Sequence, residues 1–542
     1  MRVAHDNDRL SWGDALFLYL EREGMPLNIA SVSVFEGDIS LKDCRNFIDS
    51  KLPLIPRYRQ RVAVPAFHLG LPVWEYDPEF DIANHVREVT LKHGTDTELK
   101  ALAGQILSKL MDRRRPLWDY TLVHGLKNGC SAMITRIHHC MADGIAGIGI
   151  MNVLMGPSPS VSHMPKKKLP FSAPQPRDPW TLLLDGLLDS YSNLVERLLT
   201  AQSDVVQMGQ KLLVANANGN APKGNGAGGN LMQYLSEVTA PTQRLSFNVT
   251  CRGPQKFAWA EIPVVDIKAV KSACNATFND VIMAAVTLTV RRYAELHRNR
   301  IKGRLLRIMV PVNVRGNGTA KDLGNRISLV PVSIPLDIRN PRKLVRAIHD
   351  RTQFLKGAHA AELIGFAGNL FGITPTAIQA LAGPIASALP VSIFNMVCTN
   401  VPGPEFPLYF LGHKMLRWYP YVPIGGEMAV NCAILSYDGK VYFGFSGDVH
   451  AVPDLVKLES FLKTSFAEMQ KSAGVSDSNK GHATPKKRRA AAAAPVRSTD
   501  GQNVSSIQPR PIPPRSVPST RNIHAKPAER AHYQSAFAAA GD

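Results

Sequence analysis

The sequence predicts a mixed α/β or α+β protein with two lobes. Strand-like and helix-like segments occur together in both halves of the chain, and a stretch over 176–235 separates the halves. The 542 residues are 45% hydrophobic, which is enough for two cores, because a single core stops growing at roughly 250–300 residues. We therefore expect an N-terminal lobe over 1–175 and a C-terminal lobe over 236–471.

Three segments have the composition of strands. Residues 30–35 alternate between polar and apolar side chains, as a half-buried strand does, and residues 441–445 are a second candidate. Residues 327–334 are mostly apolar and rich in β-branched side chains, and Pro331 within them indicates an edge strand or a bulge. Helical spacing of apolar residues occurs in two further segments, 279–294 and 344–355.

The stretch over 176–235 combines an amphipathic helix with a flexible linker. After Trp180, leucines recur at spacings of 3, 4 and 7, which indicates a helix with one apolar face. Three lysines at 166–168 precede it, so a membrane-surface anchor is one interpretation and a helix packed across the two lobes is the other. Residues 215–230 are mostly Gly, Asn and Ala, as in flexible linkers. The basic tail over 472–542 is predicted to be disordered.

Charge and cysteine usage limit the partners and the compartment. Lys+Arg 63 against Asp+Glu 44 gives a net charge of +19, which favours an anionic partner: a phosphate-bearing ligand, a membrane surface or nucleic acid. No nucleic-acid-binding motif accompanies this charge, so nucleic acid is not expected. Seven scattered cysteines are typical of reduced thiols in the cytoplasm. Residues 1–10 have no apolar signal region and prolines interrupt the uncharged stretch 363–404, so we expect neither a signal peptide nor a transmembrane helix.

The residues that carry chemistry are concentrated over 131–155. Residues 133–137 have the pattern of a strand that places His138 and His139 at its end, and Asp143 then stands where a helix N-cap belongs. A single histidine in such a place is usually a satisfied core residue. The string His-His-x-x-x-Asp-Gly is expected by chance only on the order of 10⁻³ times in a chain of this length, so it favours a functional site.

Two other chemistries are possible at this motif and are disfavoured. A catalytic zinc site usually takes three protein ligands, and the chain has neither an HExxH nor a paired CxxC motif to supply them. Cys140 could act as a nucleophile beside a histidine, but adjacent residues on a strand point to opposite faces. We therefore expect no metal at this site.

The motif resembles that of the CoA-dependent acyltransferases, and the chain from about residue 10 to 454 resembles the bacterial wax ester synthase / diacylglycerol acyltransferase family. Three residues differ from the usual pattern: Leu27 and Asn28 stand where members commonly have Met-His, and Thr399 replaces a serine. These changes bear on acceptor and chain-length preference. The other motifs that carry the resemblance are, in order, 11–17, 72–81, 85–87, 115–118, 279–280, 311–315, 324–325, 400–404 and 436–439.

The resemblance implies a fold and an activity. The fold would be two chloramphenicol-acetyltransferase-like lobes, each a mixed sheet with helices, and a tunnel between them. The activity would be transfer of a long-chain acyl group from acyl-CoA, as co-substrate and without a cofactor, to the hydroxyl of diacylglycerol or of a long-chain alcohol. Because the acceptor is a lipid, we expect peripheral contact with a lipid body or with the inner face of the membrane.

The resemblance also implies roles for the motif residues. His139 would be the general base that takes the proton of the acceptor hydroxyl, and His138 would orient the loop or the substrate. Asp143 would turn away and pair with an arginine, with Arg315 as a candidate, and Gly144 would let the chain turn close to the substrate. Candidate substrate-binding residues, for which channel-wall, lobe-contact or helix-capping roles are the alternatives, are Pro116, Leu117, Trp118, Asn279, Asp280 and Asn400.

Other interpretations stay open from sequence alone. A condensation-domain-like acyltransferase would take its acyl chain from a carrier protein, and a non-catalytic lipid-body or membrane-binding protein would keep only the fold. The basic run at 113–115, close to the motif in sequence, is either a site for CoA phosphates or a solvated surface.

Overall fold

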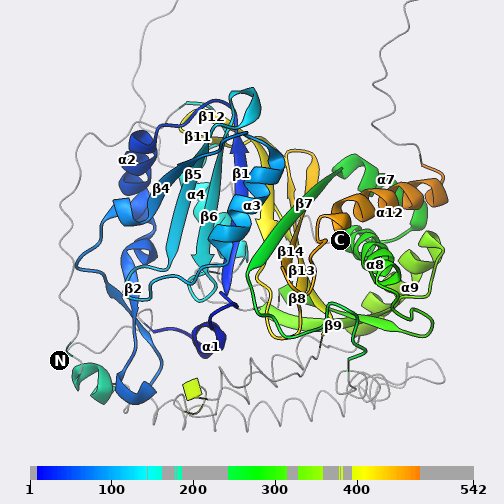
Figure 1. Ribbon diagram of the computed structural model, residues 1–542, viewed down its shortest axis with the longest axis horizontal. Helices are drawn as coiled ribbons and strands as arrows, with labels where there is room; N and C mark the ends of the chain where they lie inside the picture. Colours follow the sequence, from blue (N-terminus) through cyan, green and yellow to red (C-terminus); the bar gives the residue numbers. More distant parts are fainter. Residues whose placement is uncertain are drawn as a thin grey trace, which may run out of the picture. The chain divides into compact units, whose positions relative to one another are not determined.

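The computed structural model describes residues 9–142, 144–160, 178, 180–185, 242–313, 327–357, 378, 380–381 and 394–475. These residues form two six-stranded sheets and one two-stranded hairpin (Figure 1). Several sequence predictions lie outside the described residues, namely those for Asp143, Arg315, the lysines at 166–168, the linker at 215–230 and the tail beyond 475.

The first sheet has the strand order β11-β12-β1-β6-β5-β4. β1 pairs antiparallel with β6, from Asn28 opposite His138 to Phe35 opposite Ser131. β5 is antiparallel to β6 and parallel to β4. The strands that belong to the first part of the chain are β1 (Asn28–Phe35), β4 (Val86–Thr90), β5 (Trp118–His124) and β6 (Ser131–His138).

The other two strands of the first sheet come from the second part of the chain. β11 (Tyr409–Phe410) and β12 (His413–Tyr421) form a hairpin, and β12 pairs antiparallel with β1, from Ala30 opposite Tyr421 to Phe35 opposite Met415. The lobe boundaries stay a prediction, but the second part of the chain completes the sheet of the first.

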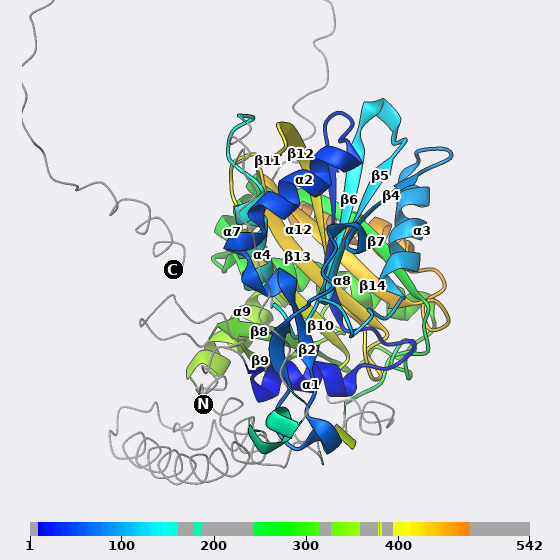
Figure 2. The same ribbon diagram turned by 90° about the vertical axis from the view of Figure 1, so that its left-hand side faces the viewer.

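Helices cover both faces of the first sheet. α2 (Leu41–Lys51) and α4 (Gly144–Leu154) lie on one face and stand in front of the strands in Figure 2. α3 (Asp96–Leu107) lies on the other face, where Arg136 of β6 donates to the carbonyl of Ile106 at 2.7 Å. The hairpin of β2 (Gln60–Ala63) and β3 (Val73–Tyr76) extends beside this sheet. Short 3-10 helices span Leu52–Leu54, Pro56–Arg59, Ala66–His68, Ile82–Asn84 and Lys127–Gly129.

The second sheet has the strand order β7-β14-β13-β10-β8-β9. Its edge strand β9 contains Pro331, as the sequence predicted, because an edge strand tolerates a residue without an N–H group. The strands are β7 (Gln255–Pro263), β8 (Leu305–Asn313), β9 (Ile327–Pro335), β10 (Met396–Pro402), β13 (Val430–Tyr437) and β14 (Lys440–Asp448). The helices α7 (Val264–Cys274), α8 (Phe278–Leu296), α9 (Pro341–Gly357) and α12 (Lys457–Ala473) gather on one side of this sheet (Figure 1).

The two sheets contact each other through β12 and β14. A Cβ atom at Gly444 would lie 1.8 Å from the carbonyl oxygen of Pro420, so only glycine allows the strands to approach this closely. Beside this point the rings of Trp259 and Tyr419 stack with centroids 4.5 Å apart. The prediction of a mixed α/β fold with two lobes is therefore confirmed.

One finding concerns membranes. Within the residues that the structure describes, no single helix is both long and apolar enough to span a bilayer, although α7 and α8 pass that test as a pair bent by 101°.

Candidate active site

Helix α1 (Trp12–Leu20) lies at the end of the first sheet where β6 finishes (Figures 1 and 2). It is capped by Ser11, whose hydroxyl accepts the backbone N–H of Asp14 at 3.1 Å. Phe17 and Glu21 are four residues apart, and side chains at this spacing lie on the same side of a helix. Each of them contacts one of the two motif histidines.

His138 is the last residue of β6 and is fully buried. Its Nδ1 accepts the backbone N–H of Cys140 at 3.1 Å, so the neutral ring carries its proton on Nε2. Nε2 lies 3.3 Å from Oε1 of Glu21. The backbone N–H of His138 donates to the carbonyl of Leu117 at 2.9 Å, which ties the end of β6 to the start of β5. Both ring nitrogens of His138 therefore face protein groups.

Glu21 is a buried carboxylate that holds several parts of the site together. Oε1 accepts the backbone N–H of Leu27 at 3.0 Å, and Oε2 accepts a hydrogen bond from Arg113 at 3.0 Å. Burial by itself would raise the pKa of Glu21, but the contacts with His138, Leu27 and Arg113 outweigh it and lower the pKa to about 2. The carboxylate is therefore ionised at neutral pH.

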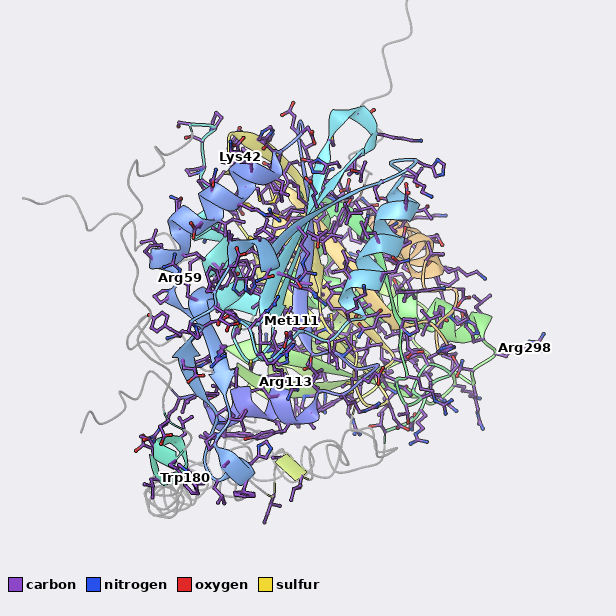
Figure 3. The ribbon with its side chains drawn as sticks, turned by 60° about the vertical axis from the view of Figure 1, so that its left-hand side comes forward. Lys42, Arg59, Met111, Arg113, Trp180 and Arg298 are labelled. Carbon is purple, nitrogen blue, oxygen red and sulfur yellow. The ribbon has the colours of Figure 1, made fainter. Side chains whose placement is uncertain are left out.

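Arg113 lies close to α1 (Figure 3), where it also donates to the carbonyl of Leu18 at 2.7 Å. The neighbouring Arg114 pairs with Asp112 at 3.0 Å. The basic run at 113–115 was one candidate site for CoA phosphates. One of its three arginines, Arg113, is paired with Glu21 instead.

His139 is partly exposed and stacks on Phe17, with ring centroids 3.9 Å apart and an angle of 8° between the planes. Its backbone N–H donates to the carbonyl of Leu27 at 3.0 Å. Nδ1 is buried without a side-chain hydrogen-bond partner in the described part of the chain, which leaves Nε2 as the nitrogen able to reach a substrate. Burial, helped by the nearby His138, lowers the pKa of His139 to about 4. The ring is therefore neutral at pH 7 and can accept a proton.

Three further residues belong to the motif or directly follow the histidines: Cys140, Asp143 and Gly144. Asp143 lies outside the described residues, and Gly144, which directly follows it, is the first residue of α4. Cys140 is buried, and burial raises the pKa of its thiol well above the usual value, so it is not a thiolate.

The segment 116–118 supports the histidines from the neighbouring strand. Leu117 holds His138 through its carbonyl, as described above. Trp118 is buried on the opposite face of the sheet, where its ring stacks on Tyr58 and His85 and its Nε1 donates to the carbonyl of Tyr58 at 2.8 Å. The structure thus places Trp118 in the core, and the substrate-binding role of this segment stays a prediction.

The second lobe brings Asn279 and Asn400 together. Nδ2 of Asn400 donates to Oδ1 of Asn279 at 2.6 Å, although the two residues are far apart in the sequence. Asp280 is buried and forms a capping box with Thr277 at the start of α8, and it also accepts from His349 at 2.8 Å. Asp280 therefore has the capping role that was the alternative to substrate binding.

Sequence reasoning missed Phe17 and Glu21 as parts of the site. Phe17 belongs to the motif at 11–17, but nothing in that motif indicates a ring stacked on His139. Glu21 is separated from His138 by more than a hundred residues, so only the packing of α1 against the end of β6 reveals their contact.

No group of three or more His, Cys, Asp or Glu side chains that could hold a metal ion occurs in the described ranges. That the reaction needs no cofactor stays a prediction.

The fold and the site together define a class of protein. Two lobes share a sheet, and a His-His-x-x-x-Asp-Gly motif at the end of a strand presents a neutral imidazole, as in the CoA-dependent acyltransferases that the sequence resembles. The model of the wax ester synthase/diacylglycerol acyltransferase catalytic domain matches residues 10–282, and the model of the WS/DGAT C-terminal domain matches residues 323–470. The chain belongs to the wax ester synthase/diacylglycerol acyltransferase family.

Individual relatives agree with this assignment. A probable diacylglycerol O-acyltransferase, tgs1 of Mycobacterium tuberculosis, is 29% identical over 471 residues, which cover 84% of this chain and 94% of the relative. A second mycobacterial protein of that name, tgs2, is 26% identical over 483 residues, or 86% of this chain and 100% of the relative.

Solved structures show the same fold. A wax ester synthase/diacylglycerol acyltransferase from Marinobacter aquaeolei superposes with a TM-score of 0.60 at 22% identity, covering 86% of this chain and all of the other. The first condensation domain of the calcium-dependent antibiotic synthetase has a TM-score of 0.52 at 14% identity, covering 86% of this chain and 97% of that domain. The condensation-domain alternative is not favoured, because the family models that match are those of wax ester synthase/diacylglycerol acyltransferase.

Proposed function

We propose that the chain transfers a long-chain acyl group from acyl-CoA to the hydroxyl of diacylglycerol, and also to that of long-chain alcohols, with His139 as the general base. The observation that carries this proposal is the state of His139: a neutral, partly exposed ring that stacks on Phe17, on a backbone held by the carbonyl of Leu27. A positioned general base contributes roughly 10²–10⁴-fold to the rate of such a reaction.

The reaction follows from this arrangement. Nε2 of His139 takes the proton of the acceptor hydroxyl while the oxygen attacks the carbonyl carbon of the thioester. The tetrahedral intermediate then collapses, the carbon–sulfur bond breaks, and the imidazolium returns its proton to the departing CoA thiolate. The products are an ester and CoA, and the enzyme regains its neutral ring. Glu21 does not relay the proton, because it faces His138 rather than His139.

We also propose that the acceptor arrives from a lipid surface at the α1 end of the molecule. A buried apolar cluster joins α1, Trp74 of β3 and Cys140, and Ala380 packs against it. Strongly exposed apolar side chains occur on the segments beside this cluster: Phe67 in the β2–β3 connection is 82% exposed and Leu381 is 74% exposed. Trp180, which is 71% exposed, lies at the same end (Figure 3). Exposed apolar groups of this kind are typical of membrane-contacting surfaces.

The test of the activity uses the purified full chain with palmitoyl-CoA and either diacylglycerol or hexadecanol, and follows thiol release. We expect release with both acceptors, and we expect His139→Ala to abolish it while circular dichroism stays unchanged. His124→Ala, at the other end of β5, is the matched control and should keep full activity. Full activity of His139→Ala would contradict the assignment of the base.

The test of lipid contact is co-sedimentation with phosphatidylcholine/diacylglycerol vesicles. Phe67→Ser combined with Leu381→Ser should reduce the bound fraction, because the apolar contact area is lost. Val265→Ser is the control, since Val265 is 60% exposed on α7 in the second lobe. Equal binding of all three proteins would contradict a lipid contact at this end.

A further inference from the structure

Asn28, at the start of β1, is a buried amide that forms no side-chain hydrogen bond with the described residues. Its exposed fraction is 1%, and neither Oδ1 nor Nδ2 has a partner in the part of the chain that the structure describes. Asn395 is equally buried but fully paired: Oδ1 accepts from Arg307 at 2.7 Å and Nδ2 donates to Gln243 at 2.9 Å. An unpaired buried amide costs about 1–3 kcal/mol and is rare in native proteins. Asn28 therefore requires an explanation other than stability.

The position of Asn28 connects it to the two histidines. It stands directly opposite His138 in the ladder between β1 and β6, and residues paired in this way project from the same face with Cβ atoms about 4.5–5.5 Å apart. The preceding residue, Leu27, donates its N–H to Glu21 and accepts the N–H of His139. The same hydrogen bonds that fix the histidines thus fix the backbone that carries the Asn28 amide.

Beside His138 and Glu21, whose polar atoms face other protein groups, Asn28 has a hydrogen-bond donor that no described residue uses. Nδ1 of His138 is occupied by Cys140, and its Nε2 faces Glu21. Both oxygens of Glu21 accept hydrogen bonds from Leu27 and Arg113. In the proposed reaction His139 takes a proton from the acceptor, so it cannot at the same time donate one to the thioester. The carbonyl oxygen, which becomes negatively charged in the intermediate, still needs a donor.

We propose that Nδ2 of Asn28 donates a hydrogen bond to the carbonyl oxygen of the acyl thioester and stabilises the oxyanion of the tetrahedral intermediate. This inference rests on the acyltransferase function proposed above. An amide is suited to the role because it is neutral and donates at every pH, and because a donor already in place needs no reorganisation when the charge develops. Because none of the described residues accepts a hydrogen bond from Nδ2, this donor is available to a substrate.

The principal test is Asn28→Leu, which keeps the volume of the side chain and removes its polar atoms. Loss of one oxyanion donor costs about 10²–10³-fold in kcat, so we expect a decrease of this size with KM changed by less than about threefold. The unfolding temperature should stay the same or rise, because the group removed was unpaired. If Asn28→Leu had the wild-type kcat and a raised unfolding temperature, the role of Asn28 would be purely structural and the proposal would be overturned.

A second variant and a control complete the test. Asn28→Asp keeps the shape but places a carboxylate beside the oxyanion, so kcat should fall at least as far as in Asn28→Leu. Ser33→Ala removes another buried polar group of β1 that has no hydrogen-bond partner among the described residues. Ser33 lies opposite Met133 and away from the histidines, so this variant should keep the wild-type kcat. If His139→Ala were active, the proposed function would fail. If activity depends on His139 but not on Asn28, the inference alone fails.

Discussion

Replacement of Glu21 by glutamine tests how the histidines are held. The substitution keeps the shape of the side chain and removes its charge, so the contact with Arg113 loses its ionic character and Nε2 of His138 loses its charged neighbour. The pKa of Glu21 is lowered from 4.5 to about 2, which at about 1.4 kcal/mol per unit corresponds to roughly 3 kcal/mol of stability. Arg113 is 47% exposed, so solvent screens its part of the interaction. We therefore expect Glu21→Gln to lower the free energy of unfolding by about 2–3 kcal/mol.

The stability effect has a defined pH dependence. A carboxylate whose pKa is lowered in the folded state contributes stability above its unfolded pKa, and this contribution is lost as the pH falls through the folded value. The urea midpoints of wild type and Glu21→Gln, followed by tryptophan fluorescence, should therefore differ at pH 7 and converge as the pH falls from about 4.5 toward 2. Midpoints that differ equally at all pH values would refute this explanation.

The same variant should also lose activity. Glu21 fixes Leu27, and Leu27 in turn fixes the backbone of His139, so the base shifts when the carboxylate is lost. A displacement of about 1 Å can cost roughly 10²-fold in rate, and we expect kcat in the thiol-release assay to fall by about that factor. Glu75→Gln, which breaks the pair with Arg61 on the β2–β3 hairpin, is the matched control. Wild-type kcat in Glu21→Gln would refute the reasoning.

Three further predictions follow from the geometry. Because burial lowers the pKa of His139 to about 4, kcat/KM should be constant from pH 8 to about pH 5 and decrease only toward pH 4; a decrease centred near pH 6.5 would indicate a fully solvated imidazole instead. Phe17→Ala removes the ring stacked on His139, so kcat should fall by about tenfold in the thiol-release assay, and an unchanged kcat would contradict a positioning role. Gly444→Ala should lower the urea midpoint by the equivalent of more than about 3 kcal/mol, because the new Cβ meets Pro420, whereas Gly149→Ala in open space on α4 should not lower it.

Local patterns in the sequence predicted individual elements well. The alternation over 30–35 corresponds to β1, the apolar stretch over 327–334 to β9, and the helical spacing over 279–294 to α8. These patterns work because burial of one face imposes a period of 2 on a strand and 3.6 on a helix. The strand that ends in His138 was predicted for the same reason.

Contacts between distant residues were not accessible to the same reasoning. The pairing of β12 with β1 joins segments that neither periodicity nor composition connects. The contact between Glu21 and His138 depends on the angle at which α1 packs against the sheet. Trp118 adjoins the histidines in the predicted site, but the alternation of a strand turns its side chain into the core.

The pairing of β12 with β1 has a consequence for biosynthesis of the protein. While the ribosome is still translating the residues before His413, β1 has β6 on one side and an open edge on the other. Open edges of this kind pair readily with other chains, so a nascent or truncated N-terminal fragment should aggregate unless a chaperone covers it. An N-terminal fragment that contains the catalytic motif should therefore stay soluble only when β12 is present. β12 can be supplied in the same chain or as a separately expressed fragment.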